Sequence, residues 1–244
     1  MLARKLILLG GRFSLSSFMA RQADGLWLDT TRTNTLWQDT AGTTPAVSVG
    51  DPIGRVDSLK SSPAHTVLQS SSTLRPLLQT TGAKFDASDD NWLTDYNAAA
   101  GANFVVALVT VPASIAFNGA IIGASEGAAN RCRFLFDTSG RVCAGLGTQA
   151  EATIVGTNDR RGATLVVGFS FSGSVVRLFD DAAIAYEAAQ SGSPTTSVAF
   201  RIGAFNNSGT AVNQFGGSIK RLLVGRQFLD LKTYLQLRSS LLAA

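Results

Sequence analysis

From residue 83 onward, short apolar runs alternate with clusters of turn-forming residues. The Asp, Asn, Ser, Gly and Pro residues between the runs favour turns, because they supply the backbone conformations and local hydrogen bonds that turns need. Many short strands separated by such turns are typical of an antiparallel sandwich or jelly roll. The pattern predicts an all-β fold with strands over residues 83–86, 91–94, 103–111, 119–123, 131–136, 141–146, 152–155, 163–171, 174–180, 182–187, 197–204 and 217–225.

The alternation is clearest near residue 200. Val198, Phe200 and Ile202 occupy every second position, and Arg201 lies between the last two. Successive side chains of a strand point to opposite faces of its sheet. We therefore expect the three apolar side chains on one face and Arg201 on the other.

The first 24 residues differ from this pattern and are expected to form an N-terminal arm. Leu6–Leu9 is an apolar run suited to one strand, and Ser14–Arg21 is expected as a short helix. Two outcomes are open, because the arm either packs on the domain's own sheet or reaches a neighbouring subunit. Further along, residues 56–82 are rich in Ser, Thr and Pro and are expected as a loop.

Residues 227–244 change from a strand period to a helical one. Lys232 and Gln236 lie opposite an apolar stripe, which predicts an amphipathic helix. The stripe consists of Phe228, Leu231, Leu235 and Leu242, with Tyr234 and Leu241 beside it. We expect the helix to cover the sandwich or to pack at a subunit contact, and residues 25–226 to form a single jelly-roll domain.

The segment Gly25–Arg55 is rich in turn formers and yet contains Trp27 and Trp37. A long irregular segment stays ordered only if a few large side chains pin it to the core. We therefore predict that both tryptophans are structural rather than ligand-stacking.

Two segments, Gly25–Arg55 and Ala83–Leu93, resemble the opening of the concanavalin A-like (LamG-like) jelly-roll proteins of tailed bacteriophages and prophages. Between them, this family usually carries an Asp-Lys-Ser-Gly-Asn-Gly run, then His, then an Arg-Pro pair. Matching residues here are Asp57, His65, Arg75 and Pro76, whereas Leu59-Lys60-Ser61-Ser62-Pro63 replaces the Gly/Asn-rich centre.

The resemblance implies a concanavalin A-like β-sandwich and a non-enzymatic structural component of a phage virion, in the tail, neck or baseplate. Its partners would be other virion proteins, with a homo-oligomer or lattice as the assembled form, in a particle built in the host cytoplasm. The alternatives are a head decoration or spike protein, a carbohydrate-binding adhesin that recognises a host surface glycan, and a glycan hydrolase. Jelly rolls host all of these roles, so the fold does not choose among them.

The charge and hydropathy of the chain limit the classes of partner that we expect. The formal net charge is +4, but the basic residues form no run longer than a pair. Nucleic-acid binders usually show a basic stripe or cluster, so we expect no nucleic-acid partner. The apolar run near the N-terminus is too short for a signal peptide, and no window has the roughly 18 consecutive apolar residues of a membrane helix.

The chain has two cysteines, Cys132 and Cys143, on either side of residues 134–140, which are expected as a hairpin turn. A loop at residues 138–139 would place Cys143 opposite Phe134, with Cys132 displaced by two residues on the same face. Such diagonal neighbours are about 7–8 Å apart at Cα, which exceeds the usual disulfide range. We expect two reduced thiols, as in proteins folded in a bacterial cytoplasm.

Catalytic chemistry finds little support in the sequence. A retaining glucanase needs two carboxylates about 5–5.5 Å apart, yet Glu126, Glu151 and Glu187 each lack a carboxylate two residues away. His65 is the single histidine and would have to serve any Ser-His-Asp or Cys-His arrangement. One histidine and two cysteines without short spacing cannot form the usual tetrahedral metal cage. We expect no enzyme and no cofactor.

The sequence offers candidate residues for two kinds of ligand site, one for calcium and one for a carbohydrate. Carboxylates in loops bind calcium, and Asp86, Asp89, Asp90 and Asp95 are close in sequence, although Asp is also a routine turn residue. Sugar binding would use an exposed aromatic ring with Asn and Asp side chains for the hydroxyl groups, although Trp92 on a strand edge would more often be buried. The carbohydrate candidates are Asn91, Trp92, Asp95, Asn206 and Asn207.

Overall fold

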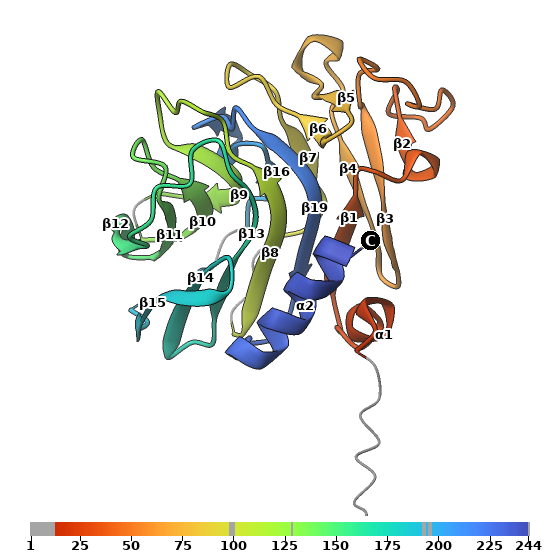
Figure 1. Ribbon diagram of the computed structural model, residues 1–244. Coiled ribbons are helices and arrows are strands. Elements are labelled where there is room, and N and C mark those ends of the chain that lie inside the picture. The colour runs from red at the N-terminus through yellow and green to blue at the C-terminus, as the bar shows by residue number, and fades with distance from the viewer. Residues whose placement is uncertain (1–12, 98–100, 128, 192–193, 195–196, 244) are drawn as a thin grey trace, which may run out of the picture.

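Two stacked antiparallel sheets form the body of the protein in the computed structural model (Figure 1). The structure describes residues 13–97, 101–127, 129–191, 194 and 197–243. The predicted all-β sandwich is confirmed, and the strands predicted from residue 83 onward are present with small shifts at their ends. The exception is 197–204, where regular pairing is limited to Arg201–Ile202.

Sheet A has the strand order β15-β14-β13-β8-β19-β6-β5. The first strand, β1, pairs with the second half of β19, next to β6. The strands of sheet A are β1 Gly25–Asp29, β5 Leu77–Gln79, β6 Gly82–Lys84, β8 Asn103–Thr110, β13 Thr164–Phe171, β14 Val175–Asp180, β15 Ala183–Ala189 and β19 Ser218–Gly225.

Sheet B has the order β12-β11-β10-β9-β16-β7-β4-β3-β2, and the hairpin β17–β18 joins it beside β9. Its strands are β2 Leu36–Trp37, β3 Arg55–Ser61, β4 Ala64–Leu68, β7 Trp92–Thr94, β9 Gly119–Ser125, β10 Arg131–Phe136, β11 Val142–Gly147, β12 Gln149–Val155, β16 Arg201–Ile202, β17 Phe205–Asn207 and β18 Thr210–Val212. Two short 3-10 turns, η1 Thr33–Thr35 and η2 Ser72–Leu74, lie in the connections.

Strand β8 shows how sheet A divides two apolar layers. Alternate side chains such as Val105 and Ala107 enter the main core between the sheets, and the residues between them, such as Val106, enter a second cluster on the outer surface. Helices α1 (Leu15–Ala20) and α2 (Leu231–Ala243) cover this second cluster. The sandwich is therefore closed by helices on one side, and sheet B supplies the other outer face (Figure 1).

Helix α2 is fixed by its aromatic residue. Tyr234 stacks on Phe179 with ring centres 4.2 Å apart, and its hydroxyl donates to the Val166 carbonyl at 3.0 Å. Gly168 leaves room for this ring, because a Cβ there would come within 2.8 Å of it. Burial of the Tyr234 side chain raises the pKa of its phenol.

The predicted helix is confirmed, but the stripe assigned to it is rotated from the buried face. The fully buried side chains are Tyr234, Leu237 and Leu241, whereas Leu231 and Leu235 are only partly buried and Leu242 is exposed. The difference arises because Tyr234, Leu237 and Leu241 are the side chains that meet the outer cluster of sheet A, while Phe228 lies in the loop before the helix.

The structure describes the N-terminal region from residue 13 onward. Leu6–Leu9 lies outside the described residues, while the predicted helix is present as α1. Phe18 and Met19 are buried in the cluster that α2 also covers. Residues 13–24 are therefore a packed part of the sandwich rather than a free extension.

The loop prediction for residues 56–82 was wrong. Strands β3 and β4 form a hairpin, with Val56 opposite Val67 and both side chains buried in the core. Between these inward residues the sequence is polar because the alternate positions lie on the outer face of sheet B. The polar composition therefore reflects an exposed strand face.

The predicted pairing of the cysteine hairpin was also wrong by one residue. Cys143 lies opposite Leu135, because the loop spans residues 137–141 rather than two residues. A shift of one residue reverses the face of a strand, so Cys132 enters the main core and Cys143 the outer face. Both cysteines are free, as expected, and burial raises the pKa of the Cys132 thiol to about 12.

Candidate functional site

The outer face of sheet B carries a row of side chains across three neighbouring strands. Leu68 of β4 lies opposite Leu93 of β7, and Leu93 lies opposite Arg201 of β16. The predicted alternation is confirmed here, because Phe200 and Ile202 are buried while Arg201 lines a groove on the surface. Leu93 keeps 40% of its surface exposed, between the buried residues Trp92 and Thr94.

Beyond Arg201, the hairpin β17–β18 covers the rest of this face. Gly123 is the next residue in the row, and a Cβ there would lie 3.0 Å from the Cβ of Phe205. The Phe205 ring lies over Arg133, with its centre 3.8 Å from the guanidinium carbon. One half of the outer face is therefore packed, and the other half is open.

The open half forms a groove of about 620 Å³. Three leucines supply apolar surface, six residues with hydroxyl or amide groups surround it, and one acid and one base complete the lining. The lining residues are Thr40, Thr66, Leu68, Gln69, Ser70, Ser71, Leu74, Leu93, Thr94, Asp95 and Arg201. Such a mixture of apolar surface and a few directed polar groups is typical of small-molecule sites.

One wall of the groove is held in place by Arg75. Its guanidinium donates to the carbonyl oxygens of Gln69, Ser70 and Gln38, at 3.0, 3.0 and 2.8 Å. Three carbonyls from two chain segments are thereby fixed by one side chain. This arrangement gives a structural role to the arginine of the Arg75-Pro76 pair.

Asp95, a lining residue of the groove, belongs to a network around the single histidine. His65 Nδ1 lies 2.9 Å from Asp95, and His65 Nε2 lies 2.7 Å from Asp24. Asp24 also pairs with Arg226 at 3.0 Å, and the pKa of Asp24 is lowered because hydrogen bonds from His65 and Arg226 outweigh the effect of burial. Both ring nitrogens of His65 face carboxylate oxygens, so neither is free to activate a nucleophile.

Arg201, the one base of the described lining, is held by two neutral acceptors. Its Nη1 donates to Asn91 Oδ1 at 2.6 Å, and its Nη2 donates to the Gly209 carbonyl at 3.0 Å. Asn91 itself is buried and also accepts from Gln69. Burial lowers the pKa of Arg201.

Three of the predicted sugar-binding residues lie near this groove, but in different roles. Asp95 lines the groove, and the side chain of Asn91 accepts a hydrogen bond from Arg201. Trp92 has no exposed surface, and its Nε1 donates to the Ile53 carbonyl at 2.8 Å. The indole is therefore part of the core and is not available to stack on a sugar.

The other two predicted residues belong to the β17–β18 turn. Asn206 is buried, donates to the Ala199 carbonyl and accepts from the Gly209 amide, so its side chain shapes the turn. Asn207 is exposed at the end of β17. Neither residue is among those that line the groove.

The calcium candidates are only partly brought together. Ligand atoms of Asp86, Asp89 and Asp90 lie within 4.8 Å of one another, whereas Asp95 belongs to the histidine network. Asp86 accepts the backbone amides of Ser88, Asp89 and Asp90, and Asp90 accepts that of Asp86. A turn capped by its own side chains accounts for this cluster. Burial and the nearby Asp86 raise the pKa of Asp90 to about 6.

The other two tryptophans are partly buried. Trp37 donates from Nε1 to Asp57 Oδ2 at 2.8 Å, and Asp57 also accepts from Arg55. Trp27 packs against the outer cluster beneath the helices. Their structural role stays a prediction, although these contacts are consistent with it.

Sequence reasoning missed Leu68, Leu93 and Gln69 as site residues, and it placed Arg201 on the opposite face from its apolar neighbours without assigning it a role. A signal was present in β7, where Leu93 lies between two residues that face the core. A leucine at the outward position of a short strand indicates exposed apolar surface.

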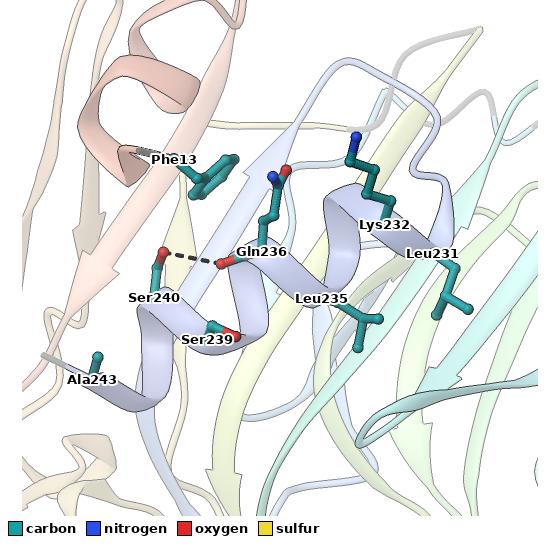
Figure 2. Close-up of a pocket in the computed structure, with 8 residues that line it drawn as sticks. All are labelled: Phe13, Leu231, Lys232, Leu235, Gln236, Ser239, Ser240 and Ala243. Atoms are coloured by element: carbon teal, nitrogen blue, oxygen red, sulfur yellow. Dashed lines mark hydrogen bonds between the residues drawn. The ribbon is translucent and has the colours of Figure 1, made fainter. Parts of the chain in front are cut away.

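A second hollow, of about 860 Å³, lies along the outer side of α2 (Figure 2). Phe13, Leu231 and Leu235 give it an apolar character, with Lys232 and Gln236 at its edge. The remaining lining residues are Ser239, Ser240 and Ala243. The expectation that α2 takes part in a subunit contact stays a prediction.

The glutamates are bound into separate contacts. Glu151 pairs with Arg133 at 2.9 Å, while Glu187 pairs with Arg177 and Glu126 accepts from Ser197. Among the described residues that line the groove, Asp95 is the one carboxylate.

In the part of the chain that the structure describes, no helix has the length and hydropathy needed to span a membrane.

Comparison with known proteins places the fold. No protein-family model matches the chain, and no curated protein matches it either. The binding domain of Paraclostridial Mosquitocidal Protein 1 is similar in structure, with a TM-score of 0.60, 7% identity, and coverage of 82% of this chain and 52% of that one.

A structure of botulinum neurotoxin type C is also similar, with a TM-score of 0.55 and 12% identity. The cell entry of that toxin is described as dependent on interaction with two ganglioside molecules. The match covers 92% of this chain and 52% of that one, so this chain spans about half the length of each of these two matched chains. The Ruminococcus gnavus IT-sialidase CBM40 bound to α2,3-sialyllactose has a TM-score of 0.47 and 17% identity, over 57% of this chain and 83% of that one. The first two of these structures show that the β-sandwich fold is shared.

Proposed function

We propose that this chain is a non-enzymatic glycan-binding module, and that the groove on the outer face of sheet B holds the glycan. The row Leu68–Leu93–Arg201 carries the proposal, because it combines exposed apolar surface with directed polar groups on a rigid sheet. A sugar ring also has apolar C–H faces and a rim of hydroxyl groups, so the two surfaces are complementary.

Free hydroxyl groups at the rim support this assignment. The side chains of Thr40, Thr66 and Ser70 line the groove and make no hydrogen bond to another described residue. They can therefore donate to and accept from sugar hydroxyls without breaking an existing contact. The botulinum neurotoxin that shares the fold is described as interacting with gangliosides, which agrees with the proposal, although a shared fold does not by itself transfer function.

Binding without hydrolysis agrees with the charged groups of the groove. A retaining hydrolase needs two carboxylates about 5–5.5 Å apart, and Asp95 is the one acid among the described lining residues. His65 is engaged by Asp95 and Asp24. We therefore assign the groove to recognition rather than to bond cleavage.

We further propose that the module belongs to the virion of a tailed bacteriophage, where it contacts a host surface glycan together with other virion proteins. This part of the proposal rests on the resemblance of Gly25–Arg55 and Ala83–Leu93 to phage jelly rolls. Mass spectrometry of purified particles would test it, because a virion component must be present at a constant copy number.

Glycan binding is tested with a matched pair of leucine variants. Leu93 in the groove and Leu77 at the edge of sheet A are similarly exposed, at 40% and 42%. Burying a leucine side chain contributes about 2 kcal/mol, so covering the exposed 40% of Leu93 contributes about 0.8 kcal/mol, or roughly fourfold in affinity.

A glycan array would first identify a ligand, and calorimetry would then compare Leu93→Ala with Leu77→Ala. We expect weaker binding for the first variant alone. Equal loss in both variants, or no bound glycan in a broad array, would reject the groove as a glycan site.

A further inference from the structure

The arginine that lines the groove indicates which class of glycan it takes. Arg201 leaves β16 toward the groove and has Leu93 on one side in the row and Gly123 on the other. Because Gly123 has no side chain and Leu93 is apolar, neither neighbour in the row offers an acceptor to the guanidinium.

The contacts of Arg201 leave its charge without a counter-ion. Its two acceptors, Asn91 Oδ1 and the Gly209 carbonyl, are both neutral. Within the described residues, no carboxylate forms an ion pair with it, whereas Arg133 on the same face pairs with Glu151 at 2.9 Å. A partly buried cation without a paired anion is unfavourable in a folded protein.

The guanidinium also has hydrogen-bonding capacity to spare. A guanidinium carries five N–H donors, and each terminal nitrogen of Arg201 has one acceptor among the described residues. One N–H on each terminal nitrogen therefore remains for a ligand. The two existing bonds orient the group without filling it, and an oriented guanidinium is well suited to a carboxylate, sulfate or phosphate.

Asp95, the one acid of the described lining, is engaged elsewhere. Its carboxylate lies 2.9 Å from His65 Nδ1, and among the described residues no ion pair joins it to Arg201.

We propose that the groove selects an acidic glycan, whose negatively charged group is bound by Arg201 while a sugar ring lies over Leu93 and Leu68. This inference rests on the proposed glycan-binding function and adds the ligand class. Asn91 acts as a positioning residue, because it holds the guanidinium and is itself buried.

The first test uses the unmodified protein and matched ligands. The best acidic glycan from an array of sialylated, uronic-acid, sulfated and phosphorylated sugars is compared with the same glycan neutralised, as a methyl ester or by removal of the sulfate or phosphate. A charge-assisted contact predicts about ten- to a hundredfold weaker binding after neutralisation. The difference should shrink between 50 and 500 mM NaCl, because salt screens the contact.

The second test locates the contact. Arg201→Gln should remove the preference for the acidic form, Arg201→Lys should retain part of it, and Arg21→Gln should retain all of it. Arg21 is an exposed arginine on α1's C-terminal side, so its substitution changes the net charge equally without touching the groove.

The outcomes separate the two proposals. Equal binding of the acidic and neutral forms by the unmodified protein would overturn the acidic-glycan inference and leave glycan binding intact. An acidic preference that survives in Arg201→Gln would also overturn it, by placing the anion elsewhere. Failure to bind any glycan would instead reject the proposed function itself. If Arg201→Gln does not fold, the matched-ligand comparison and Arg201→Lys still decide the result.

Discussion

Trp92 and Leu93 are consecutive residues of β7 with opposite predicted roles. Trp92 is completely buried, donates to the Ile53 carbonyl at 2.8 Å and meets Phe85 edge-on at 5.1 Å between ring centres. Replacing it with Phe removes the donor and leaves the Ile53 carbonyl buried without a partner. The lost bond, the unsatisfied carbonyl and the smaller ring should together cost about 2–4 kcal/mol of unfolding free energy.

Leu93→Ala should behave in the opposite way. The side chain is partly exposed on the sheet face, and surface substitutions usually change stability by about 0.5 kcal/mol or less. Its effect should appear instead in the affinity for a glycan. The two variants therefore test fold stability and glycan binding separately, at consecutive residues of one strand.

Urea unfolding followed by far-UV circular dichroism measures both variants against the parent, and thermal melts give a second reading. For a chain of this size, each 1 kcal/mol corresponds to about 2–4 °C in melting temperature. Under conditions in which the Trp92→Phe variant is folded, it should bind glycan with the affinity of the parent. If this variant instead melted like the parent and lost glycan binding, the indole would belong to the ligand site and the assignment of the two faces of β7 would be refuted.

Further predictions concern stability, pH and assembly. Trp37→Ala should lose about 3 kcal/mol, because it removes packing and the hydrogen bond to Asp57; a melting temperature equal to the parent's would count against its structural role. The pKa of Asp90 is raised to about 6, so the folded state binds its proton more tightly and the parent should gain stability as the pH falls from 7 to 5. Asp90→Asn should remove this gain and be at least as stable at pH 7.5, and a parent that loses stability over that range would contradict the sign. Arg75→Gln should raise hydrogen exchange at the Gln69–Ser71 wall and weaken glycan binding; unchanged exchange there would show that the three carbonyl contacts do not hold the wall. Sedimentation velocity should detect a species heavier than the 25.5 kDa chain, and a single monomer peak across concentrations would end the expectation of a homo-oligomer.

The strands from residue 83 onward could be predicted because their turn residues are local signals. The hairpin β3–β4 could not, because its outward residues are polar and only Val56 and Val67 face the core. The same ambiguity affects α2, whose period was read correctly while its buried face was not. A helical period gives the spacing of apolar residues, but the surface that a helix meets determines which of them are buried.

The groove was predictable only in part, since its row joins strands that are distant in the sequence. Leu68, Leu93 and Arg201 meet through sheet pairing, and pairing order is a property of topology rather than of local pattern. Asp95, predicted as a sugar-binding candidate together with Trp92 and Asn91, does line the groove. Trp92 was misassigned as a sugar ligand because an aromatic residue beside Asn suggests stacking, although the alternation of β7 places it inside.

The β17–β18 hairpin gives the binding surface an adjustable boundary. It covers Arg133 with Phe205, and at its turn the Gly209 carbonyl accepts from Arg201. The two sheets do not depend on the length of this turn for their main contacts, which lie between them. Insertions or deletions at residues 207–210 could therefore lengthen or shorten the groove and re-aim its single guanidinium while the core is preserved. If the groove binds glycans as proposed, a change in this one turn would shift the range of ligands without a new fold.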